Sequence, residues 1–106
     1  MTAALINVPK KAKNGDIIEI KTLTSHVMET GYRHTARGEI IPRDIITSFT
    51  CRFEGDEIFR ADFFPATAAN PFLSFFTIAT KSGKFDFEWI GDNGFSQTAS
   101  ASITVE

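Results

Sequence analysis

Three residues of this chain, Cys51, His26 and His34, belong to the types that most often carry chemistry in proteins. A catalytic cysteine needs an accessible thiolate on a mobile or electropositive element. Cys51 instead lies between Phe49 and Phe53 in a segment that alternates apolar and polar residues. On the apolar side of a strand, a cysteine behaves as a small buried hydrophobe with a raised pKa. We therefore expect Cys51 in the core; a surface position or a bond to a partner chain is the alternative.

The two histidines do not predict a metal site. His26 and His34 flank a turn that contains Glu29, so Glu29 and Cys51 are the further ligands that could be considered. A structural zinc site needs four ligands, and the sequence has no Cys-x-x-Cys or His-x-x-x-His spacing. A mononuclear iron centre of the superoxide reductase type would need four histidines and a cysteine, whereas this chain has 2 histidines. We predict no metal, no cofactor and a surface or loop-bracing role for both imidazoles.

No other pattern predicts catalysis. The sequence contains no Gly-x-Ser-x-Gly nucleophile motif and no glycine-rich phosphate loop. Asp62, Asp86, Glu88 and Asp92 are acids without a visible partner geometry, and outward positions on expected strands explain most of them. We therefore predict no catalytic residue and a protein that is not an enzyme.

Length and charge narrow the class of function further. The 106 residues form one domain over positions 1–106, because separate cores need roughly 50 or more residues each. A net charge of −2 gives no positive surface for nucleic acid or for an anionic membrane. The first thirteen residues lack the basic lead and the apolar core of a signal peptide, and no apolar run is long enough to cross a membrane. We expect neither nucleic acid nor membrane as a partner, and no signal peptide. These features alone indicate either a cytoplasmic protein or a mature chain whose leader was removed.

Alternation between apolar and polar residues predicts an all-β protein. The clearest case is the segment in which Phe85, Phe87 and Trp89 share one face. Many short strands separated by frequent turns argue for two packed sheets, an immunoglobulin-like β-sandwich of about seven antiparallel strands. The expected strands are Leu5–Val8, Asp16–Leu23, Asp44–Phe53, Glu57–Phe63, Phe72–Thr80, Lys84–Ile90 and Phe95–Val105.

The strand expected over Asp44 to Phe53 has a defined inner face. Strict alternation turns Phe49 and Cys51 inward and Ile46 outward. The turn at Glu54-Gly55-Asp56 then joins this strand to the next one as a hairpin.

Four segments carry a resemblance to a known family. They read INVPKKAKNGDIIEIKTL at 6–23, HVMETGYRHTARGEIIPRDII at 26–46, CRFEGDEIFRADFFPATAANPF at 51–72 and SGKFDFEWIGDNG at 82–94. In this order and spacing, the chain resembles the SoxZ family nearly end to end. These are the Z subunits of the SoxYZ sulfur carrier of thiosulfate oxidation. The family usually has a proline after the first histidine of the second segment, where this chain has Val27.

The resemblance implies a non-catalytic subunit that forms a heterodimer with a Y-type subunit. In that family, sulfur is carried by a cysteine on a glycine-rich C-terminal arm of the Y subunit, which visits the other Sox enzymes. The last ten residues of this chain contain neither cysteine nor glycine, so it resembles the half that does not carry sulfur. The resemblance also implies a periplasmic location, reached by export together with the partner, and transient docking to the Sox enzymes.

Two regions are candidates for binding that partner. The loop from His26 to Arg43 contains Met28, Tyr32 and three arginines, Arg33, Arg37 and Arg43, and these residue types are enriched at interface cores. In the extended pairs Phe63-Phe64 and Phe75-Phe76, one ring of each pair cannot join the core and needs a cover. The predicted partner-binding residues are His26, Met28, Tyr32, Arg33, Arg43, Phe64, Phe72 and Phe76.

Other interpretations of these regions stay open at this point. The long loop could be a crossover between sheets with solvated arginines, and a loop of the same chain could cover the aromatic rings. If it is unpaired, the cationic loop could favour an anionic sulfur adduct on the partner through Arg33 or Arg43. A self-associating immunoglobulin-like structural or adhesion module, homo-oligomeric when isolated, is the alternative function.

Overall fold

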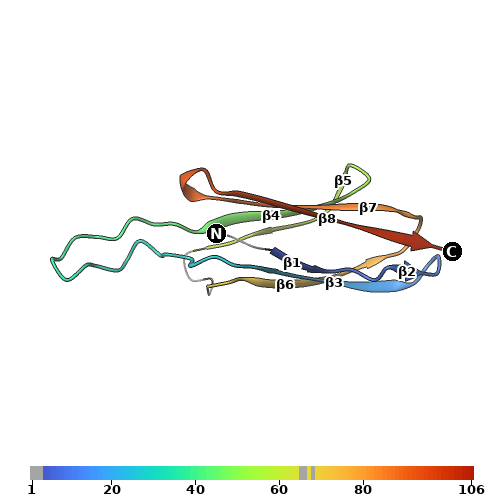
Figure 1. Cartoon of the computed structure of the whole chain (residues 1–106), viewed down its shortest axis with the longest axis horizontal. Helices are drawn as coiled ribbons and strands as arrows, with labels where there is room; N and C mark the ends of the chain where they lie inside the picture. Colours follow the sequence, from blue (N-terminus) through green and yellow to red (C-terminus); the bar gives the residue numbers. More distant parts are fainter. Residues whose placement is uncertain (1–3, 65–66, 68) are drawn as a thin grey trace.

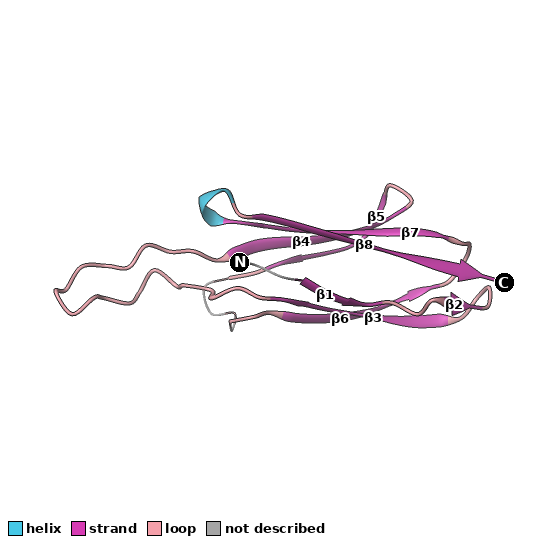
Figure 2. Ribbon diagram, in the orientation of Figure 1, coloured by secondary structure: helices cyan, strands magenta, loops and turns pink. Residues whose placement is uncertain are grey.

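Two sheets, antiparallel except for the pairing of one short strand, pack face to face in the computed structural model, which describes residues 4–64, 67 and 69–106. A three-stranded sheet has the order β1-β3-β6, and a five-stranded sheet has the order β2-β8-β7-β4-β5. Figures 1 and 2 show the two layers one above the other. The strands are β1 (Ala4–Asn7), β2 (Lys11–Ala12), β3 (Ile17–Thr24), β4 (Ile46–Phe53), β5 (Asp56–Asp62), β6 (Phe72–Ile78), β7 (Gly83–Gly91) and β8 (Ser96–Val105), with a 3-10 turn η1 (Asp92–Gly94) before β8.

The predicted immunoglobulin-like sandwich is therefore confirmed, and its core is largely aromatic. Phe85, Phe87 and Trp89 of β7 are at most 3% exposed, as their alternation indicated. Phe59 of β5 and Phe75 of β6 stack across the two sheets, with ring centroids 4.2 Å apart and planes at 1°. A stacked aromatic pair is favourable beyond the apolar area that it buries, so this pair holds the two sheets together on this side of the sandwich.

Cys51 lies in this core, as expected. Its side chain is fully buried, and its neighbours across the ladder are Phe59 on β5 and Phe87 on β7. Burial raises the pKa of the Cys51 thiol from 9.0 to about 12, and the negative charge of Asp86 adds to the effect. The thiol therefore stays protonated at neutral pH and has no route to solvent.

The outward position predicted for Ile46 is wrong. The register between β4 and β7 shifts between Ile46 and Ser48, and this bulge turns both Ile45 and Ile46 into the core. An inserted residue breaks the two-residue period, so strict alternation cannot predict the faces on its N-terminal side. A second difference is β2, a short additional strand that pairs parallel with β8.

The molecule is elongated, with extents of 60 × 21 × 20 Å. The reason is the chain between β3 and β4, which leaves the three-stranded sheet, runs away from the sandwich and returns to the five-stranded sheet (Figure 1). We call residues 25–44 the arm. The two sides of the arm are joined by isolated bridges between Glu29 and Asp44 and between His34 and Ile40. The arm is thus the crossover between sheets, drawn out into a narrow hairpin.

Candidate partner-binding site: the arm and the apolar sheet face

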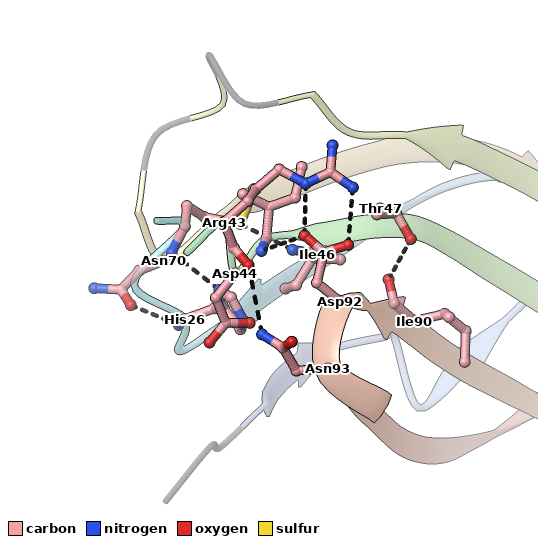
Figure 3. A network of polar contacts seen from close by, with 11 residues as sticks. His26, Arg43, Asp44, Ile46, Thr47, Asn70, Ile90, Asp92 and Asn93 are labelled. Carbon is pink, nitrogen blue, oxygen red and sulfur yellow. Dashed lines mark hydrogen bonds and ion pairs between the residues drawn. The ribbon is translucent and has the colours of Figure 1, made fainter. Parts of the chain in front are cut away.

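His26 is buried at the root of the arm, where it orders the surrounding backbone (Figure 3). Its ring Nδ1 accepts a hydrogen bond from the Met28 N–H at 3.0 Å, and its Nε2 lies 3.6 Å from Asp44 Oδ1. Its backbone N–H donates to Asn70 Oδ1 at 2.8 Å, and its carbonyl accepts from the Asn70 N–H at 2.7 Å. The ring also meets Phe95 edge to face at 4.8 Å. These contacts fit the predicted loop-bracing role, with the side chain turned into the chain itself.

Met28 is the second predicted binding residue that turns inward. Its side chain is 4% exposed, and its sulfur accepts the N–H of Ile46 at 3.3 Å. The backbone of Met28 has φ of +52°, in the left-handed region that residues other than glycine rarely adopt. The contacts of His26 and Ile46 hold this turn from both sides. His26 and Met28 therefore shape the arm from inside and are not part of its surface.

Arg43 connects the arm to the turn between β7 and β8. Its Nε and Nη2 donate to the two carboxylate oxygens of Asp92 at 2.8 and 2.9 Å, and Asp92 also accepts the N–H of Ile45 at 3.2 Å (Figure 3). The hydrogen bonds from Arg43 hold the pKa of the Asp92 carboxyl below its usual value. A two-pronged pair of this kind fixes direction as well as distance. It therefore sets the direction in which the arm leaves the sandwich.

Arg33 is paired in the same way within the arm. Its Nε donates to Glu29 Oε2 at 3.0 Å and its Nη2 to Glu29 Oε1 at 2.6 Å, and these hydrogen bonds lower the pKa of the Glu29 carboxyl. Both arginines considered for an anionic adduct are thus neutralised by carboxylates. The hypothesis of an unpaired cation at Arg33 or Arg43 is not supported by this arrangement.

The outer half of the arm is exposed to solvent. Tyr32 is 76% exposed and Ile40 62%, and every residue between them is exposed as well. Gly31 lies across from Arg43, where an added Cβ would stand 3.0 Å from the Cβ of Arg43. The two sides therefore run close together below a solvent-exposed tip.

The predicted aromatic residues lie on the outside of the sandwich. Phe72 is 60% exposed and Phe76 67%, both on the outer face of β6, whereas Phe75 is the ring that faces the core. Phe64, just after β5, is 65% exposed. In each of the two consecutive pairs, the second ring is the one without a cover among the residues that the structure describes.

Sequence reasoning missed three further side chains that extend this face. Leu5, Ile17 and Ile78 are 66%, 73% and 59% exposed. The register places Leu5 beside Leu23 and Leu23 beside Phe72, and it places Ile17 beside Ile78. Ile78 follows Phe72 and Phe76 at the strand period and could have been found from it. Leu5 and Ile17 could not, because their neighbours lie on other strands.

We call this surface of the β1-β3-β6 sheet the apolar sheet face, defined by residues Leu5, Ile17, Leu23, Phe72, Phe76 and Ile78. A polar row of Asn7, Lys21 and Ser74 separates its two apolar clusters, Leu5, Leu23 and Phe72 on one side and Phe76, Ile78 and Ile17 on the other, and Lys21 pairs with Glu19 at 3.7 Å. Large exposed apolar surfaces rimmed by polar residues often mark interaction sites. Within the described part of the chain, no helix is long and apolar enough to cross a membrane.

Fold and surface together define a class: an immunoglobulin-like β-sandwich with an arm joined to the sandwich by the Arg43–Asp92 pair and an exposed apolar sheet face. The family model of the sulphur oxidation protein SoxZ matches residues 6–102, nearly the whole sequence. The chain therefore belongs to the SoxZ family and has a role in Sox sulfur oxidation. A search of curated proteins gave no significant match.

Solved structures support the fold. A superoxide reductase (neelaredoxin) from Ignicoccus hospitalis has a TM-score of 0.73 at 20% identity, covering 97% of this chain and 80% of that chain. The sulfur carrier protein SoxY from Chlorobium limicola f thiosulfatophilum has a TM-score of 0.69 at 17% identity, covering 98% of this chain and 79% of that chain. A putative superoxide reductase from Thermotoga maritima has a TM-score of 0.68 at 19% identity, covering 97% and 85%. At these identities the likeness concerns the fold alone.

Proposed function

We propose that this chain is the non-catalytic subunit of a SoxYZ sulfur carrier. It binds a Y-type subunit whose C-terminal cysteine carries the sulfur intermediates of thiosulfate oxidation. Its own thiol, Cys51, is buried between aromatic neighbours with a raised pKa, which is the opposite of what a carrier or nucleophile needs. An iron centre of the kind considered from the sequence would need four imidazoles, and the chain has 2 histidines.

The observation that carries this proposal is the apolar sheet face. Five of its side chains, Leu5, Ile17, Phe72, Phe76 and Ile78, are at least 59% exposed. Together they present on the order of 600 Å² of apolar area, close to the roughly 800 Å² per side of a standard protein interface. Exposing this much apolar area to water is unfavourable in free energy, so we expect a permanent partner to bury it.

The arm has a separate role in this proposal. Its exposed outer half includes Tyr32, and it is anchored through the pair between Arg43 and Asp92. A rigidly directed projection that leaves the sheet face uncovered suits transient docking of the Sox enzymes beside the partner's carrier arm. We propose the periplasm as the location, reached by export together with the Y-type subunit.

Coexpression tests the proposal. The chain and a Y-type subunit from the same genome are purified through a tag on one of them, and light scattering gives the mass of the complex. We expect a 1:1 complex, and we expect Phe76→Ser to weaken it at least about tenfold, since one buried ring contributes more than 1.4 kcal/mol. Ile90→Ser, at a partly exposed position on the other sheet, is the matched control. Two chains that elute separately refute the proposal.

The alternative is self-association through the same apolar sheet face, as in a structural or adhesive module. The exposed rings of Phe72 and Phe76 would favour it in the absence of a partner. A tight homodimer that persists when the Y-type subunit is added would select this alternative.

A further inference from the structure

Each sheet has two edge strands, one short (β1 or β2) and one of 7 residues (β6 or β5), and the two long edges are very different. In β5, four of the seven residues are charged, namely Asp56, Glu57, Arg60 and Asp62, and its ladder with β4 has an irregularity near Cys51. Charges and bulges are the devices by which proteins keep an edge strand from pairing with another chain. The β5 edge is therefore protected.

The other long edge, β6, has none of these devices. Its sequence FLSFFTI contains no charge and no proline, and it pairs with β3 over Phe72 to Ile78 without a register shift. It is the outer strand of the order β1-β3-β6. A regular, uncharged edge of this length is a template for strand pairing.

The hydrogen-bond pattern shows which groups of β6 are unpaired. Ala79 donates its N–H to the carbonyl of Asp16 at 2.8 Å, and the Pro71 carbonyl accepts the N–H of Thr24 at 3.2 Å. Because backbone groups alternate between the two sides of an antiparallel strand, residues 73, 75 and 77 also bond toward β3. The N–H and C=O groups of residues 72, 74, 76 and 78 therefore point to the open edge, where the structure gives them no partner among the described residues.

These open groups adjoin the apolar sheet face. Phe72, Phe76 and Ile78 point their side chains outward and their backbone groups toward the open edge. A strand added beside β6 would satisfy these backbone groups and lay its own alternate side chains against the same rings. One occupant would thus cover both features.

We propose that β6 receives an extended strand of the Y-type subunit, so that one continuous sheet runs through the interface. This inference rests on the proposed function, which supplies that partner. The solved SoxY structure has the same kind of sandwich, with a TM-score of 0.69 over 98% of this chain, so such a partner has edge strands to offer. Packing of side chains alone would leave the open backbone groups of β6 unpaired at the border of an apolar interface, which is costly.

Amide hydrogen exchange of the purified complex, read residue by residue by NMR, tests this. In the isolated chain, the amides of residues 72, 74, 76 and 78 exchange fast, while those of 73, 75 and 77 are already protected. In the complex we expect the first set to slow by about a hundredfold or more. A complex in which they remain fast refutes strand addition and leaves the proposed function standing, whereas the absence of any complex refutes both. Protection in the isolated chain would assign the edge to a second copy and overturn the proposal.

Two proline variants give an independent test. Ser74→Pro removes an N–H from the middle of the open β6 edge, and Arg60→Pro removes one from the β5 edge. The N–H of residue 60 also points to the open side of β5. Phe63 donates its N–H to the Thr47 carbonyl at 2.9 Å, and because backbone groups alternate along the strand, odd-numbered residues bond to β4 and residue 60 does not. We expect Ser74→Pro to weaken the complex at least about tenfold and Arg60→Pro to leave it unchanged. Equal affinities overturn the proposal, provided that circular dichroism shows both variants folded. Ser74→Ala, which keeps the backbone N–H and adds no charge to the edge, should bind as tightly as the unchanged chain, so that a loss in Ser74→Pro is assigned to the missing N–H.

Discussion

The reactivity of the only cysteine gives the most quantitative prediction of this account. With a pKa of about 12, the Cys51 thiol of the folded chain is ionised in roughly one molecule in ten thousand at pH 8. With the value of 9.0 that applies to an exposed thiol, it is ionised in roughly one molecule in ten. Since the thiolate is the reacting form, we expect alkylation of the folded chain to be about a thousandfold slower than that of the unfolded chain.

The assay is iodoacetamide labelling at pH 8, followed by intact mass, on the folded chain and on the chain in urea. A Cys51→Ala, Ser100→Cys variant is the control, because position 100 is exposed on β8 and should label at the unfolded rate in both conditions. The unfolded fraction of a typical domain is below about one in a thousand, so transient unfolding does not mask the effect. Labelling of Cys51 in the folded chain within tenfold of the unfolded rate would refute the burial argument, and with it the reason for assigning sulfur carriage to the partner.

Three further predictions concern stability and the arm. The free energy of unfolding should fall between pH 9 and about 12, by up to about 1.4 kcal/mol per pH unit, because the thiol of the unfolded chain ionises first while the buried one keeps its proton. Urea titrations of Cys51→Ala over this pH range should lack this loss of stability. The same pH dependence in both proteins would contradict the prediction. Gly91→Ala should cost about 1–3 kcal/mol, because the added Cβ would stand 2.5 Å from the Ile45 carbonyl oxygen; a urea midpoint no lower than that of the surface variant Ser100→Ala would count against this packing. Asp92→Asn should speed amide exchange at Ile45 and along the arm, because Asp92 holds both Arg43 and the Ile45 N–H; unchanged exchange would show that the arm is anchored by other contacts.

Local patterns predicted most of the fold. The alternation of Phe85, Phe87 and Trp89 depends only on the pleat of one strand, so the sequence is enough to assign their faces. The hairpin of β4 and β5 is equally local, because its turn needs two residues with positive φ and has Glu54 at +51° and Gly55 at +90°. The burial of Cys51 followed from its aromatic neighbours.

What could not be predicted depends on contacts between distant segments. Ile46 turned inward because of a bulge against β7, and strand β2 exists only because β8 lies beside it. The pairing of Arg43 with Asp92 joins residues far apart in the sequence. The composition of the loop from His26 to Arg43 does not distinguish the inward Met28 from the outward Tyr32, and its role in binding stays a prediction.

The central claim is that this chain supports a sulfur carrier without carrying sulfur. The most direct test is intact-mass spectrometry of the reconstituted complex with its Y-type subunit after loading with thiosulfate by the other Sox enzymes. We predict that all of the added sulfur mass appears on the Y-type subunit, and that this chain keeps its unmodified mass of 11.7 kDa. A sulfur adduct on this chain, at Cys51, would contradict the account.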